Sequence, residues 1–292
     1  MYHHLYSQPS SSGQQQDIRE KQPYEAFLVL DVEATCREGT GFDWPNEIIE
    51  WPVCLMRWKD RSGEGNASQL EIVDEFRSFV KPTWRPQLSQ YCMNLTGITQ
   101  AQVDSAPTFP VVLKRFARFL AKHGLIGSEN GRPIQRFCWC SDGPFDIRHF
   151  VVKQCFISRV PMPPWIRGDI LDVRRSVSSW ETDNKQETTA VEVPIYSFAV
   201  PLDITDSRRA GQLPEISRRQ PLNMHLQLQA LGLPEFQGRP HSGIDDARNL
   251  ARIMAELARR GVRLIPNASI RPNRRWYWMG RPGEVREDLL QD

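Results

Sequence analysis

The segment FLVLDVEAT (residues 27–35) joins an apolar run to two carboxylates. Its β-branched and aromatic content predicts a strand that is buried on both faces. Side chains two apart on a strand point to the same face, so Asp31 and Glu33 are expected to face one spot. Two like charges at the end of a buried strand cost roughly several kcal/mol unless a cation neutralises them. The alternative is a solvated strand end with an incidental pair, and this segment alone leaves both open.

Length and periodicity predict one α/β domain with a long insertion. The chain has 292 residues, more than a usual single domain, but an insertion accounts for the excess. Further strands are predicted at 46–58, 71–82 and 136–140, with a possible strand at 191–200. Helices are predicted at 108–123, 145–156 and 245–261.

Composition divides the chain into four parts. Residues 1–22 are rich in Ser, Gln and His and are predicted to be a disordered arm. The globular domain is expected over 23–270, and a C-terminal tail over 271–292. Residues 176–220 within the domain look irregular, which predicts a functional loop or a partly disordered insertion.

Charge and cysteine content restrict the class of protein only weakly. The formal net charge of +2 permits a phosphate-rich partner but does not require one. The six cysteines form no CxxC pair, so we expect free thiols in a reduced, intracellular protein of the cytoplasm or nucleus. No apolar run approaches the roughly 20 residues of a membrane span, so no membrane partner is expected.

A third carboxylate is offered by SDGPFDIRHF (residues 141–150), directly after the predicted strand at 136–140. Asp146 would enter the first turn of a helix at the edge of the sheet where ligands gather in open α/β folds. The alternative is that Asp146 only stabilises the helix N-terminus electrostatically. Asp142 competes with it for the same role.

The segment HSGIDDARN (residues 241–249) supplies a histidine and a fourth carboxylate. His241 lies on a Gly-containing loop, and Asp246 follows five residues later at the start of the long predicted helix. Asp245 would point about 100° away from it. A lone histidine before a helix is usually a surface residue or a cap. Here it precedes a carboxylate that can reach the pocket of the other three.

Four carboxylates and a histidine form a set that suits phosphodiester hydrolysis. Two divalent cations would balance the four negative charges, and two metals roughly 3.5–4 Å apart can clamp the attacking and leaving oxygens of a phosphoryl centre. A histidine that titrates near neutrality can accept the proton of the attacking water.

The order D-x-E-x-T, F-D and H-x₄-D resembles the DEDDh family of 3′-to-5′ exonucleases. These motifs are carried by Asp31, Glu33, Thr35, Phe145, Asp146, His241 and Asp246. Longer segments at 46–53, 88–110, 142–146 and 236–253 resemble the "enhanced RNA interference" exoribonucleases, which include the histone-mRNA 3′ exonuclease. The resemblance runs from about residue 25 to 266 and is interrupted by the insertion.

This resemblance implies an RNase H-like fold, a mixed five-stranded sheet flanked by helices on both faces. It also implies two Mg²⁺ ions (Mn²⁺ being possible) per site, with His241 as the general base. The implied metal ligands are Asp31, Glu33, Asp146 and Asp246. The implied contacts to the terminal nucleotide are Ala34, Thr35, Tyr91, Leu95, Thr96, Phe145 and His241. For Tyr91 and Leu95 the alternative is ordinary core packing.

The implied activity is removal of nucleotides from the 3′ end of structured or small RNA, with release of nucleoside 5′-monophosphates. The alternatives are a DNA exonuclease of the same family and a non-catalytic RNA-binding module. The module is disfavoured because all four carboxylates and the histidine are present. Residues 1–22 are too short for the SAP module of longer animal relatives, so substrate choices that depend on that module are not expected here. No protein partner is predicted.

Basic and aromatic residues alternate in the C-terminal tail. Such a mixture suits binding of phosphates together with stacking on bases. The residues are Arg271, Arg274 and Arg275 with Trp276, Tyr277 and Trp278, and Arg208, Arg209, Arg218 and Arg219 of the insertion add to the charge. The alternative is that the tryptophans pack onto the domain and the arginines are solvated.

Overall fold

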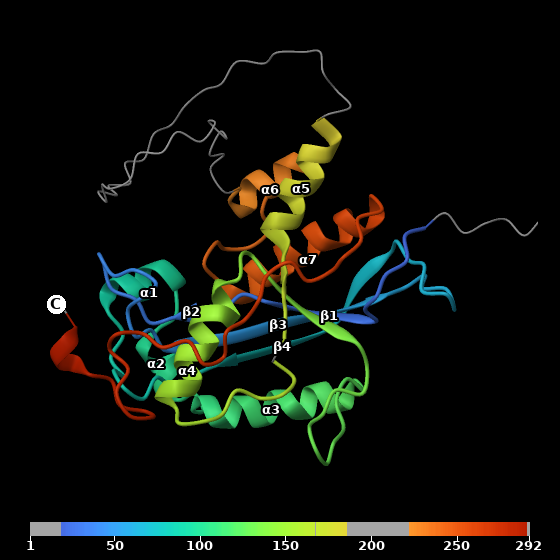
Figure 1. Cartoon of the computed structure of the whole chain (residues 1–292). Helices are drawn as coiled ribbons and strands as arrows, with labels where there is room; N and C mark the ends of the chain where they lie inside the picture. The colour runs from blue at the N-terminus through green and yellow to red at the C-terminus, as the bar shows by residue number, and fades with distance from the viewer. Residues whose placement is uncertain (1–18, 167, 186–221, 291–292) are drawn as a thin grey trace, which may run out of the picture.

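A computed structural model describes residues 19–166, 168–185 and 222–290 (Figure 1). A mixed sheet forms its centre, with strands β1 Ala26–Leu30, β2 Glu33–Ala34, β3 Ile48–Trp58, β4 Leu70–Phe79, β5 Phe137–Ser141 and β6 Leu171–Asp172. β3 pairs antiparallel with β1, β2 and β4, whereas β1 with β5 and β5 with β6 are parallel pairs. This is the mixed sheet that the family resemblance implies.

The six strands fill five positions, because β1 and β2 lie in line along one edge of β3. β1 pairs with the second half of β3 and β2 with its first half. The break falls at Asp31 and Val32, where the N–H of Val32 leaves the sheet and donates to Asp146 Oδ1 at 2.9 Å. The predicted strand over 27–35 is therefore interrupted where its carboxylates begin. The fifth position is occupied by β6, and the possible strand at 191–200 lies outside the described residues.

Helices cover both faces of the sheet (Figure 1). The described helices are α1 Gln90–Thr96, α2 Gln100–Asp104, α3 Phe109–Lys122, η1 Asp146–Val151, α4 Val152–Ile157, α5 Val173–Lys185, α6 Met224–Ala230, α7 Gly243–Arg259 and the short η2 Glu287–Leu289. The three predicted helices are confirmed as α3, η1 with α4, and α7.

Strand alternation assigns each side chain of β1 to one of two cores. Leu28 and Leu30 pack in the core with α3, whereas Phe27 and Val29 pack in the core with α7. All four are fully buried. β1 is thus buried on both faces, as predicted, and its carboxylates emerge only past its end.

Two predicted boundaries differ from the structure. The sequence predicts an insertion over 176–220, but its first ten residues continue the regular helix α5, whose Val173 and Val177 are buried against α6 and α7. The remainder of the insertion, with its four arginines, lies outside the described residues. At the N-terminus, Gln22 is buried, its Nε2 donates to Val262 O and its Oε1 accepts from Leu264 N. The ordered domain therefore begins before residue 23, and residues 1–18 are not described.

The tail from residue 271 folds back onto the domain. Trp276 and Trp278 are buried, and their indole N–H groups donate to the carboxylate and the carbonyl of Asp43. Base stacking by these two tryptophans is therefore ruled out, and the alternative that they pack onto the domain is confirmed. Tyr277 between them is 57% exposed. In the part of the chain that the structure describes, no helix has the length and apolarity needed to cross a membrane.

Candidate active site

The predicted carboxylates meet at one edge of the sheet because β1 and β5 run parallel. Asp31 follows β1, and Asp146 follows β5 in the first turn of η1. η1 is π-helical, a rare geometry that is frequent at functional sites. The N-terminus of α7 reaches the same edge at Gly243, where an added Cβ would lie 2.5 Å from Asp31 O. Glycine is thus required for the approach that brings Asp246 beside Asp31.

Three of the four carboxylates form a compact cluster. One ligand oxygen each from Asp31, Glu33 and Asp246 lies within 4.8 Å of the others. Asp146 adjoins this cluster, with its Oδ1 held by the N–H of Val32. The Oδ2 atom of Asp246 is buried and has no hydrogen-bond partner among the described residues. A buried acceptor without a donor fits a site for a cation.

The pKa values of the four carboxylates also fit a site for a cation. Burial, followed by repulsion from the neighbouring carboxylates, raises the pKa of Asp31 and of Glu33 well above the ordinary range. Burial raises the pKa of Asp146 and of Asp246 to about 7. Without a cation these carboxylates would hold protons near neutrality, and a divalent cation would displace them.

Asp142 and Asp146 have different surroundings. Arg174 donates to both oxygens of Asp142, at 3.1 and 2.8 Å, and Gln227 Nε2 donates to it at 2.7 Å. The protein thus already compensates the charge of Asp142. No side chain among the described residues forms an ion pair with Asp146, which makes Asp146 the better candidate for a metal ligand.

His241 stands at the rim of the cluster. Its backbone adopts φ of 60°, unusual for a residue other than glycine, and its backbone N–H partly offsets the rise in the pKa of Asp246. Burial, and then the nearby Arg239, lower the pKa of the imidazole from 6.5. The ring is consequently neutral at pH 7, which is the state that a general base requires.

A pocket of about 300 Å³ opens beside the cluster, and we call it the active-site pocket. Six of the predicted substrate and metal residues line it: Glu33, Ala34, Thr35, Leu95, Thr96 and His241. The other lining residues include Cys36, Thr40, Phe42, Asn46 and Phe150, which the sequence did not single out. Tyr91 and Phe145 do not line this pocket. Tyr91 is exposed on α1, and Phe145 stacks on Phe42 with a centroid separation of 4.9 Å.

Arg239 is a positioning residue that the sequence did not reveal. Its Nη2 donates to the carbonyls of Asn94 and Leu95, at 3.0 and 2.9 Å, and its Nη1 donates to His241 O at 3.3 Å. It thereby ties the end of α1 to the histidine loop. At Gly97, where φ is 69°, an added Cβ would lie 2.7 Å from this guanidinium. In the sequence, only the Thr96–Gly97 pair at the end of α1 indicated a close approach at this point.

The sequence did not indicate a role for Glu50 either, although it lies in the segment 46–53 that resembles the exoribonucleases. Its side chain is fully buried on β3, opposite Glu33 in the register. Arg77 Nε donates to one of its oxygens at 2.6 Å, and the N–H of Gly243 donates to the other at 3.3 Å. Glu50 therefore holds the N-terminus of α7 against the sheet beside the cluster.

Lys153 supports the far wall of the pocket. Its buried ammonium group donates to the carbonyls of Phe42 and Trp44 and to Asn46 Oδ1. Burial lowers the pKa of this ammonium group to about 7. The loop that carries Phe42 and Asn46 into the active-site pocket is fixed by these bonds.

Comparison with known proteins places this chain in a family. The model of the RNase_T family, described as "Exonuclease", matches residues 28–137. The 3′-5′ exonuclease eri1 of Schizosaccharomyces pombe is 34% identical over 267 residues, covering 87% of this chain and 72% of the relative. The 3′-5′ exoribonuclease 1 of Homo sapiens is 32% identical over 244 residues, covering 84% of this chain and 55% of the relative. The chain thus spans little more than half of this human protein.

Solved structures agree with the sequence relatives. The nuclease domain of 3′hExo, a DEDDh family member bound to rAMP, is 30% identical, with a TM-score of 0.64 over 86% of this chain and all of that one. A 3′-exonuclease that recognises the histone mRNA stem-loop gives a TM-score of 0.65 at 30% identity, over 87% of this chain and 71% of that one. The fold is therefore that of these nucleases. This chain belongs to the DEDDh family of 3′-5′ exonucleases.

Proposed function

We propose that this protein is a divalent-metal-dependent 3′-to-5′ exonuclease that acts on RNA and releases nucleoside 5′-monophosphates. The observation that carries the proposal is the cluster of buried carboxylates with raised pKa values beside an open pocket. The names of the relatives support RNA as the substrate, since the human relative is named an exoribonuclease and the 3′hExo nuclease domain was solved with rAMP.

The donor set suits hard divalent cations. Carboxylate oxygens are the ligands that Mg²⁺ and Mn²⁺ prefer, and four such charges would balance two ions. We assign the ligand role to Asp31, Glu33, Asp146 and Asp246, which lie together at the sheet edge. When bound, the ions would stabilise the charge that develops on the phosphoryl oxygens.

The other site residues would transfer a proton, bind the nucleotide and position the histidine. His241, neutral at pH 7, would accept the proton of the attacking water. The active-site pocket would hold the terminal nucleotide between Leu95 and the backbone that follows Glu33. Arg239 would keep the histidine and the pocket wall in register.

The test is degradation of 5′-labelled RNA with a 3′ overhang and of DNA of the same sequence, with Mg²⁺, with Mn²⁺ or with EDTA. We expect an RNA ladder that shortens by one nucleotide at a time, disappears in EDTA and is slower for DNA. Immediate release of a labelled mononucleotide would show the opposite polarity and overturn the proposal. Equal rates on RNA and DNA would overturn the choice of RNA.

A further inference from the structure

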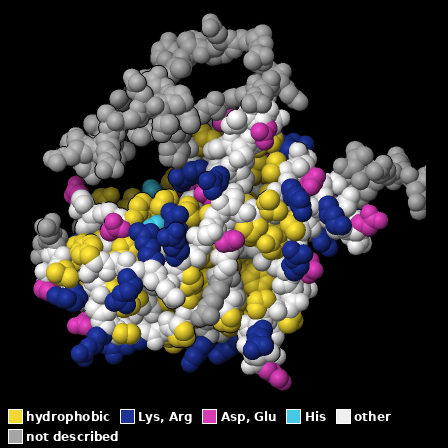
Figure 2. Space-filling view, in the orientation of Figure 1, with side chains coloured by type: hydrophobic (Ala, Val, Ile, Leu, Met, Phe, Trp, Pro, Cys, Tyr) yellow, Lys and Arg dark blue, Asp and Glu magenta, His cyan; other side chains and the backbone are white. Residues whose placement is uncertain are grey.

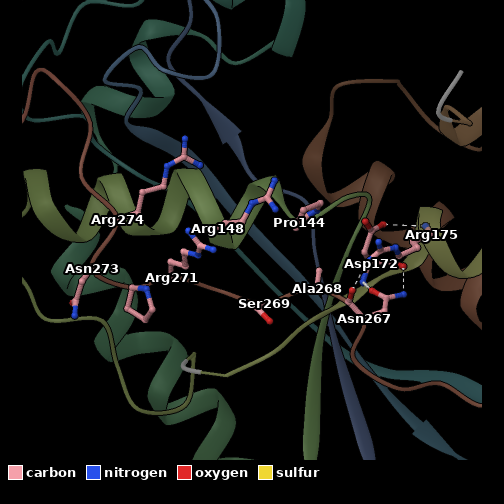
Figure 3. A pocket seen from close by; sticks show the side chains of 11 residues that line it. Pro144, Arg148, Asp172, Arg175, Asn267, Ala268, Ser269, Arg271, Asn273 and Arg274 are labelled. Carbon is pink, nitrogen blue, oxygen red and sulfur yellow. Dashed lines mark hydrogen bonds between the residues drawn. The ribbon is translucent and has the colours of Figure 1, made fainter. Parts of the chain in front are cut away.

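A second, larger cavity of about 1250 Å³ lies beside helix η1, which contributes Arg148 to its lining (Figure 3). Small-molecule pockets usually span about 300–1,000 Å³, so this cavity suits an extended ligand. Three segments that are distant in sequence form it, around residues 144–148, 172–175 and 267–274. We call it the arginine cleft, because Arg148, Arg175, Arg271 and Arg274 line it.

The cleft carries uncompensated positive charge. Four arginines face a single lining carboxylate, Asp172. Within the described ranges, Arg148, Arg175 and Arg271 form no ion pair, and the only pair of Arg274 joins it to Asp43 at 3.6 Å. Figure 2 shows Lys and Arg side chains gathered near the centre of the face in view. Such a surface attracts an anionic ligand.

Hydrogen bonds hold one wall of the cleft in place. Asn267 Oδ1 accepts from the backbone N–H of Asp172 at 2.8 Å, and Asn267 Nδ2 donates to the carbonyl of Asp172 at 3.0 Å. Arg175 Nη1 donates to Asn267 O at 2.6 Å, and these three residues form the bonded group in Figure 3. Arg175 is thereby positioned without using a carboxylate, so its charge remains available to a ligand. A preorganised wall lowers the cost of binding.

An aromatic pair connects the cleft with the active-site pocket. Phe42 lines that pocket, is 53% exposed and stacks on Phe145. The guanidinium of Arg148, a residue of the cleft, lies 5.3 Å from the ring centroid of Phe145. A strand that leaves the pocket over Phe42 would therefore meet Arg148 next. Exposed aromatic rings beside basic groups are typical of single-strand binding paths.

We propose that the arginine cleft binds the backbone phosphates of the substrate RNA on the 5′ side of the nucleotide in the active-site pocket. The proposal rests on the proposed function for the direction of the strand, but its charge chemistry can be tested separately. Contacts to backbone phosphates carry no sequence information, so a cleft that binds phosphates would bind RNA without regard to sequence. The cleft would increase the affinity for long RNA and would not change the affinity for a dinucleotide, which does not reach it.

The test compares two double variants in EDTA, so that binding is measured without hydrolysis. Arg148→Ala with Arg271→Ala removes charge from the cleft, and Arg115→Ala with Arg118→Ala removes the same charge from the exposed face of α3. Binding of a long single-stranded RNA is followed across a salt series. We expect the cleft variant to bind about tenfold more weakly and the slope of log K against log salt to flatten by about 1.4, with little change in the α3 variant.

A third variant separates lost charge from lost structure. Arg148→Lys with Arg271→Lys keeps the charge, so it should bind within about threefold of the wild-type protein. Equal affinity and slope for the two alanine variants, or a lysine variant as weak as the alanine one, would overturn the proposal. Hydrolysis of a dinucleotide in Mg²⁺ is the reference reaction for the proposed function. Its absence in the wild-type protein would refute that function without affecting the binding result.

Discussion

Asp146→Asn should stabilise the metal-free protein at alkaline pH. Burial raises the pKa of Asp146 from 3.8 to about 7, so the folded protein holds this proton more tightly than the unfolded chain does. The stabilising effect of that proton is complete below about pH 4 and is lost as the pH rises through 7. At about 1.36 kcal/mol per pKa unit, the ionised carboxylate costs up to about 4 kcal/mol at pH 8.

Asparagine removes this charge and keeps an oxygen that can accept from Val32 N. In urea unfolding with EDTA, we therefore expect Asp146→Asn to raise the free energy of unfolding by about 2–4 kcal/mol at pH 8 and by almost nothing near pH 4. Addition of Mg²⁺ should stabilise the wild-type protein more than the variant. A variant less stable than wild type at pH 8 in EDTA would refute the argument.

Asp142→Asn is the matched control, and its expected effect has the opposite sign. It weakens a pair with Arg174 whose side chains are only 27% and 12% exposed, together with the bond from Gln227. The loss should be about 1–3 kcal/mol and should not depend on Mg²⁺. Two aspartates four residues apart would thus be distinguished by the sign of their effect on stability. Destabilisation of equal size by both variants would mean that Asp146 is a structural residue.

Three further changes test other parts of the site. Gly243→Ala places a Cβ 2.5 Å from Asp31 O, so it should lower the free energy of unfolding by about 1–3 kcal/mol. Unchanged stability in urea unfolding would refute the close approach. Arg239→Ala removes three hydrogen bonds to carbonyl groups and should lower kcat/KM about tenfold with unchanged Mn²⁺ affinity. Loss of Mn²⁺ binding by this variant would contradict a positioning role. His241→Asn should lower the single-turnover rate about 10²–10⁴-fold. Weaker Mn²⁺ binding by His241→Asn would identify the histidine as a ligand.

The sequence predicts that the carboxylates meet, although the strand that was expected to carry Asp31 and Glu33 breaks between them. The continuous apolar run over 27–30 predicts burial on both faces, and the two-residue spacing of Asp31 and Glu33 predicts a shared face. The amphipathic stripe of α7 likewise places Asp246 at a helix start. These inferences need no knowledge of distant contacts, and the structure agrees with them.

Other features depend on contacts that no local pattern encodes. The F-D motif already implied Asp146, but the compensation of Asp142 comes from Arg174, a residue 32 positions away. Arg239 bonds carbonyls more than 140 positions away. The tail tryptophans pack in the core that contains α3, and Asp43, more than 230 positions away, accepts from both indole groups. For α5, however, a signal was present. Val173, Val177 and Trp180 have helical spacing, but the polar residues between them concealed it.

The central claim is that the buried carboxylates form a site for divalent cations, and direct titration with Mn²⁺ tests it. Bound Mn²⁺ can be counted from the loss of the free-ion electron paramagnetic resonance signal, at pH 8 and in the presence of AMP. We predict two ions for the wild-type protein and for Asp142→Asn, and fewer for Asp31→Asn and Asp146→Asn. Equal Mn²⁺ binding by all four proteins, or no saturable binding by any of them, would contradict the claim.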